Sequence, residues 1–89
     1  MVERNVGPVL VGGPTSRAVV AAIEALNREA TIVDRQGYLR VRVPGRCVVT
    51  RAAIEEHLGR SFELRTELEP LLASFAGRLT LTPEEARWE

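Results

Sequence analysis

The sequence predicts an α+β fold in which two main helices pack on short, mostly antiparallel or mixed β-sheets. Three observations lead to this fold class. Apolar and polar residues alternate from Tyr38 to Val43, as in a strand with one buried face. Two segments combine helical spacing of apolar residues with residues that begin or end helices. Gly and Pro separate the segments, so we expect the order β-α-β-β-β-α-β-β-β, in one domain of residues 1–89 with a core from about 5 to 82.

The start of the chain predicts a strand followed by a helix. Residues Val6–Val11 are apolar and mostly β-branched, but Pro8 has no N–H to donate, so we expect this strand at a sheet edge or with a bulge. Thr15 or Ser16 is the expected cap of a helix that runs to about Arg28. The expected buried face of this helix carries Val19, Ile23 and Leu26.

A β-hairpin is predicted next. Thr31–Asp34 is extended, residues 36–37 favour a tight turn, and Tyr38–Val43 forms the return strand. Alternation gives the return strand an apolar face of Leu39, Val41 and Val43 and a polar face of Tyr38, Arg40 and Arg42. Three interpretations of the polar face stay open: a solvated surface, a protein contact, or a nucleic-acid surface that lacks the strand motifs of RNA-binding sheets.

The second half begins with a strand and a capped helix. Cys47–Val49 is extended, Thr50 caps a helix over Arg51–Leu58, and Gly59 takes the position just after its end. The pattern is then less regular, because Pro70 argues both against a helix interior and against a central strand. Two further strands are predicted at the C-terminus, over Arg78–Thr82 and Ala86–Trp88.

Charge and composition exclude several classes of partner. The chain is 45% hydrophobic and 27% charged, which is typical of a folded globular domain. All 12 basic residues are Arg and they balance 12 acidic ones, so no net charge attracts nucleic acid or a membrane surface. One Cys cannot form an internal disulfide, and no apolar run has the length of a signal peptide or a membrane span. We therefore expect a cytoplasmic protein.

No constellation of catalytic or metal-binding residues is expected. One Cys and one His are too few for a zinc site. We expect Cys47 to be a small buried thiol in a strand and His57 a half-exposed helix residue, with a Cys–His dyad as the alternative. The glutamate pairs fit solvated faces. The strand–Gly–helix junction at 11–15 lacks both G-x-G-x-x-G and a P-loop Lys, so no cofactor is expected.

Several short motifs resemble a known family when they are taken in order. They are Asn5-Val6-Gly7-Pro8, Asp34-Arg35 followed by Tyr38, Leu58-Gly59-Arg60 followed by Phe62, Leu68-Glu69, and Ser74-Phe75-Ala76-Gly77-Arg78. In this order and spacing they resemble the effector, or coupling, proteins of bacterial multicomponent soluble diiron monooxygenases, whose systems oxidise toluene, phenol, alkenes or methane. The resemblance covers about residues 5–79 and implies that Glu67–Ala73 is an edge or bulged strand.

The resemblance implies a non-catalytic subunit without metal or cofactor. Such a subunit binds a diiron hydroxylase and adjusts its active site for O₂ activation and coupled hydroxylation or epoxidation of a hydrocarbon. A reductase, with or without a ferredoxin, would supply the electrons. The alternative functions are a small adaptor of an unrelated enzyme complex and a minor enzyme that uses Cys47.

Two segments are the expected protein interface. Their residues are Asn5, Val6, Gly7, Pro8, Ser74, Phe75, Ala76 and Gly77. Each segment joins small or conformationally special residues to an apolar side chain, which suits close docking. From the residues alone, Phe75 is either a core side chain at a bend or an exposed anchor, and the core position is favoured.

Overall fold

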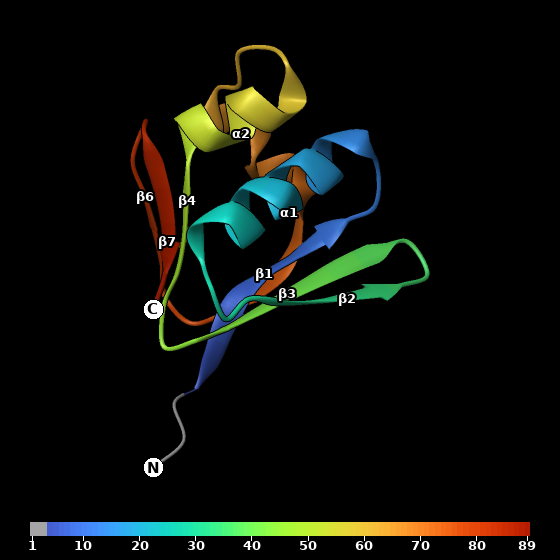
Figure 1. The fold of residues 1–89 in the computed structure, drawn as a ribbon, viewed down its shortest axis with the longest axis vertical. Helices are drawn as coiled ribbons and strands as arrows, with labels where there is room; N and C mark the ends of the chain where they lie inside the picture. The colour runs from blue at the N-terminus through green and yellow to red at the C-terminus, as the bar shows by residue number, and fades with distance from the viewer. Residues whose placement is uncertain (1–3) are drawn as a thin grey trace.

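The computed structural model describes residues 4–89, so residues 1–3 of the expected domain lie outside the described part. Two sheets and two main helices surround one core (Figure 1). The elements in chain order are β1 (Asn5–Val11), α1 (Pro14–Leu26), β2 (Thr31–Arg35), β3 (Tyr38–Pro44), β4 (Cys47–Thr50), α2 (Arg51–Leu58), α3 (Leu64–Glu67), the 3₁₀ turn η1 (Glu69–Leu71), β5 (Leu72–Ala76), β6 (Leu79–Leu81) and β7 (Glu85–Trp88). The predicted α+β class and order are confirmed, with α3 and η1 as additions.

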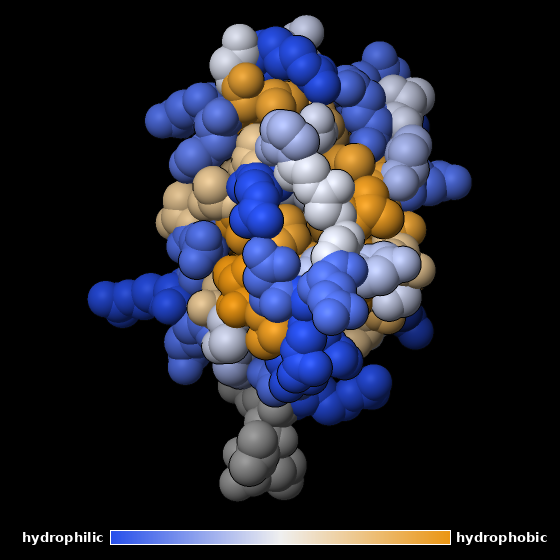
Figure 2. Space-filling view, turned by 90° about the vertical axis from the view of Figure 1, so that its right-hand side faces the viewer, coloured by the Kyte–Doolittle hydropathy of each residue, from blue (hydrophilic) through white to orange (hydrophobic). Residues whose placement is uncertain are grey.

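The two sheets have different sizes and share the core. One has four strands in the order β2-β3-β1-β5, the other has three in the order β4-β7-β6, and all pairs are antiparallel. Helix α1 lies over the four-stranded sheet, and α2 lies beyond α1 near β4 (Figure 1). In Figure 2, hydrophilic side chains project at the top, the sides and the lower end of the molecule, and apolar patches lie between them.

Strand β1 lies inside its sheet, so the expectation that Pro8 confines it to an edge is wrong. The strand pairs with β3 on one side and with β5 on the other. On the β3 side the ladder skips Gly7 and Pro8 and keeps the same register before and after them, so the missing N–H interrupts pairing only locally. The irregularity that we expected occurs on the β5 side, between Val9 and Leu10.

Helix α1 begins and ends earlier than predicted. It starts at Pro14, which needs no N–H partner in the first turn, and no side chain caps it, so Thr15 and Ser16 are not caps. Leu26 is its last residue and is 47% exposed, whereas the rest of the predicted apolar face is buried. The helix stops there because the next residue adopts an extended conformation.

Asn27 ends α1 and fastens it to β4. Its amide nitrogen donates to the carbonyl oxygens of Ile23 and Val48, both at 2.7 Å. Its amide oxygen accepts the N–H of Val48 at 3.0 Å. The Ile23 carbonyl also accepts the backbone N–H of Asn27 at 2.9 Å, so this residue closes the end of α1 and joins it to the edge strand β4.

The predicted hairpin and second helix are confirmed. Strands β2 and β3 pair in full register, and Leu39, Val41 and Val43 are buried while Tyr38, Arg40 and Arg42 are exposed. Thr50 caps α2 by accepting the N–H of Ala53 at 3.2 Å. Gly59 follows the helix in a left-handed conformation.

The strand expected over Glu67–Ala73 is wrong for most of its length. The chain makes the short helix α3 and the turn η1 first, and β5 begins only at Leu72. Pro70 sits at the start of η1, where a missing N–H costs little. The Glu67 carboxylate accepts the N–H of Glu63 at 2.7 Å and a guanidinium N–H of Arg60 at 3.0 Å, and both contacts lower its pKa.

Gly77 lets the chain cross from the four-stranded sheet to the three-stranded one. Its φ is +95°, and a Cβ placed on it would lie 2.8 Å from Cγ1 of Val6 and 2.9 Å from the carbonyl oxygen of Glu89. The next residue, Arg78, exchanges two backbone hydrogen bonds with Glu89 at 2.8 and 3.0 Å. Both the conformation and the lack of space therefore require glycine here.

We expect Gly77→Ala to lower the free energy of unfolding by about 2–4 kcal/mol, because it adds a steric clash to an unfavourable φ. Gly59→Ala is the matched control, since Gly59 also has a positive φ but nothing lies within 4 Å of its added Cβ. The control should cost only about 1–2 kcal/mol. Urea denaturation measures both, and equal losses would show that the contacts with Val6 and Glu89 impose no constraint.

Candidate functional site

Cys47 and His57, the residues of the alternative Cys–His dyad, have different surroundings: one is buried and the other is exposed. Cys47 is fully buried in β4, as predicted, and burial raises the pKa of its thiol to about 12. His57 lies on the exposed side of α2, where its Nδ1–H donates to the carbonyl oxygen of Ala53 at 2.9 Å. A thiol that is neutral and inaccessible cannot act as the nucleophile of a surface dyad.

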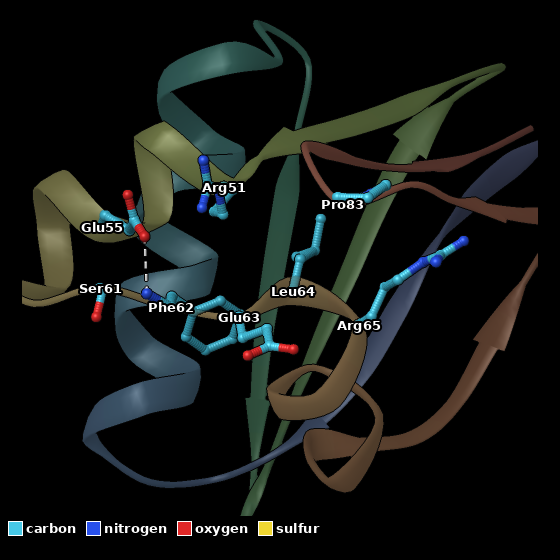
Figure 3. A pocket seen from close by; sticks show the side chains of 8 residues that line it. All are labelled: Arg51, Glu55, Ser61, Phe62, Glu63, Leu64, Arg65 and Pro83. Atoms are coloured by element: carbon cyan, nitrogen blue, oxygen red, sulfur yellow. Dashed lines mark hydrogen bonds between the residues drawn. The ribbon is translucent and has the colours of Figure 1, made fainter.

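A cleft of about 500 Å³ lies between α2, residues 61–65 and the turn at Pro83 (Figure 3). Two of its polar side chains, Arg51 and Glu55, already have structural partners. A Glu55 carboxylate oxygen accepts the N–H of Phe62 at 2.8 Å, drawn as the dashed line, and Arg51 pairs with Glu84 at 2.7 Å. These contacts hold the loop after α2 in place, and charged side chains of both signs line the cleft.

The described part of the chain contains neither a metal-binding cluster nor a membrane-spanning helix. Residues 4–89 contain no group of three or more His, Cys, Asp or Glu side chains that could hold a metal ion. No helix within those residues is long and apolar enough to cross a membrane.

The two segments expected at a protein interface lie side by side. Antiparallel pairing of β1 with β5 places Gly7 opposite Ala76 and Pro8 opposite Phe75. The sequence alone could not show this, because about 70 residues separate the partners. Asn5, Ser74, Phe75 and Ala76 are exposed, Gly77 is half-buried, and Val6, Gly7 and Pro8 are buried.

Phe75 is exposed, so the favoured expectation that it is a core side chain is wrong. Its exposure is 45%, although it lies opposite the buried Pro8. Strand β5 forms the edge of the sheet, so no further strand or helix covers its outer side. Phe75, Tyr38 and Leu26 are the large hydrophobic residues that the described chain exposes, and two of these three belong to the four-stranded sheet.

The outer face of the four-stranded sheet, the face turned away from α1, carries a shallow depression. Its volume is about 250 Å³, and residues of β1, β3 and β5 line it. Gly7 is one of the lining residues, and only glycine fits there, because its φ is +141° and a Cβ would lie 2.7 Å from the carbonyl oxygen of Val41. Two arginines of β3, Arg40 and Arg42, border it, and Phe75 lies at its edge. The sequence predicted that Arg40 and Arg42 share a face of β3, but it could not show that residues of β5 extend this face.

Comparisons with known proteins identify a family for this chain. Residues 4–89 match the model of the MmoB/DmpM family. The effector subunit of the alkene monooxygenase system of Xanthobacter autotrophicus is 40% identical over 90 residues, which are 99% of this chain and 88% of that subunit.

Solved structures of low sequence identity share the fold. A chain from the structure of the phenol hydroxylase–regulatory protein complex superposes with a TM-score of 0.86 at 23% identity, covering 98% of both chains. The soluble methane monooxygenase regulatory protein B superposes with a TM-score of 0.71 at 22% identity, covering 94% of this chain and 63% of that one. By its match over residues 4–89 and its 40% identical relative, this chain belongs to the MmoB/DmpM family and is an effector or regulatory subunit rather than a catalytic one.

Proposed function

We propose that the chain binds the diiron hydroxylase of a multicomponent monooxygenase and adjusts its active site for O₂ activation. The substrate is a hydrocarbon that the complex hydroxylates or epoxidises. The observation that carries the proposal is the 40% identity to an alkene monooxygenase effector subunit over 99% of the chain, which favours an alkene over an aromatic substrate. A reductase, with or without a ferredoxin, supplies the electrons to the hydroxylase.

The mechanism is differential binding. The Cys47 thiol is buried, and residues 4–89 hold no cluster of metal-binding side chains, whereas Tyr38 and Phe75 of the four-stranded sheet are exposed. A protein of this kind changes a partner only if it binds one conformation of that partner more tightly than another. A coupling free energy of about 1–3 kcal/mol changes the populations of the two conformations by about 5- to 150-fold. The cytoplasm suits the assembly, since the one Cys is a buried free thiol that needs no oxidising compartment.

Adding the chain to its hydroxylase and reductase should raise turnover and the yield of product per electron consumed. Both should saturate near one chain per hydroxylase active site, because the effect requires a specific complex. Steady-state assays with the hydroxylase encoded beside this chain measure both quantities. Unchanged turnover and unchanged yield across the titration would contradict the proposed function.

Phe75→Ala should weaken hydroxylase binding by about tenfold or more, because Phe75 is a rigid apolar side chain at the edge of the interface. Its melting temperature should stay close to that of the unchanged chain, since the ring is 45% exposed. Leu26→Ala is the matched control, as Leu26 is 47% exposed at the end of α1. If both variants bind the hydroxylase as the unchanged chain does, Phe75 has no anchoring role.

A further inference from the structure

The outer face of the four-stranded sheet has a one-sided charge although the chain as a whole is neutral. Arg35 lies on β2 opposite Tyr38, and Arg40 and Arg42 follow on β3. The remaining positions on this face are uncharged: Thr31, Val33, Asn5, Val9, Val11, Ser74 and Ala76. Among the described residues, therefore, the face carries three arginines and no carboxylate.

Nearby carboxylates do not neutralise this face. Asp34 is on β2, but it lies in register with the buried Leu39 and pairs with Arg17 of α1 at 3.1 Å, so it points to the helix side. Arg40 and Arg42 form no ion pair within residues 4–89. The acidic residues concentrate elsewhere: residues 51–70 hold five glutamates and three arginines, a formal charge of −2. The molecule thus has a basic sheet face and an acidic end at α2 and α3.

The side chains around the two arginines are those of a contact surface. Arg40 lies in a cross-strand row between Val33 and Val9, so its aliphatic stem has apolar neighbours while its guanidinium is exposed. Tyr38, which is 49% exposed, precedes it on the same face. Arg and Tyr are enriched among the residues that contribute most to protein binding.

We infer that Arg40 and Arg42 bind a pair of carboxylates on the surface of the hydroxylase, with Tyr38 beside them and the depression at Gly7 receiving a neighbouring side chain. This inference rests on the proposed function and names its contact chemistry. Two residues apart on a strand, the arginines are separated by about 6–7 Å. Carboxylates on successive turns of a helix have a similar spacing of about 5–6 Å. A guanidinium can hold each carboxylate through two parallel hydrogen bonds.

Other occupants fit this face less well. A second copy of the chain would place three arginines against three arginines, which repel each other. A nucleic acid would meet one exposed aromatic residue on the face, and it would be repelled by the acidic end of the molecule. Charge complementarity favours an acidic protein surface.

The test compares two double variants that remove the same charge from different faces. We expect Arg40→Gln with Arg42→Gln to weaken binding to the purified hydroxylase by about 10- to 100-fold at low salt and to reduce the dependence of affinity on salt. Arg28→Gln with Arg65→Gln is the control, because both residues are exposed and neither forms an ion pair within residues 4–89. The control should bind within about twofold of the unchanged chain, and both variants should keep its melting temperature.

Arg40→Lys with Arg42→Lys separates charge from hydrogen-bond geometry. It should keep the salt dependence but recover only part of the affinity, because Lys cannot form the paired hydrogen bonds. Equal binding by the two Gln variants, with tight binding by the unchanged chain, would overturn the inference and leave the proposed function intact. No hydroxylase binding by the unchanged chain would overturn both. Comparably tight binding of single-stranded DNA or RNA that is lost in the Arg40/Arg42 variant would replace the protein partner with nucleic acid.

Discussion

The burial of one face of the four-stranded sheet against α1 is the constraint on which the rest of the structure depends. Leu39 and Val41 of β3 enter the core, and because successive side chains of a strand point to opposite faces, Arg40 and Arg42 must be exposed. The same packing draws β1 so close to β3 that a Cβ on Gly7 would lie 2.7 Å from the carbonyl oxygen of Val41.

Under the proposed function, this arrangement accounts for specific binding. The side chains proposed to contact the hydroxylase stand on a hydrogen-bonded sheet, so docking would cost little conformational entropy. Although the net charge is zero, the molecule has a basic face and an acidic end. This separation of charge would orient the chain as it approaches an acidic partner. Phe75 adds an apolar contact at the open edge of the same sheet, where β5 has no further strand beside it.

Local signals in the sequence predicted much of the fold, and contacts between distant segments explain what they missed. The β2–β3 hairpin and the cap of α2 at Thr50 were predictable because each depends on a few neighbouring residues. The central place of Pro8 was not, because it depends on β5, which pairs from the other end of the chain. The exposure of Phe75 has the same origin, since a side chain on an edge strand is buried only if another element covers it. The helical segments α3 and η1 are too short for the spacing of their apolar residues to indicate a helix.

The candidate site was predictable in its parts and not in its assembly. The motifs pointed to both segments that we expect at an interface, but no local pattern shows that these segments pair and border Arg40 and Arg42. Hydroxyl-radical footprinting by mass spectrometry tests the central claim that the outer sheet face docks on the hydroxylase. Oxidation of Tyr38, which is exposed on this face, should fall when the hydroxylase is added, while oxidation of His57 on α2 should not change. Protection of His57 with unchanged oxidation of Tyr38 would contradict the account.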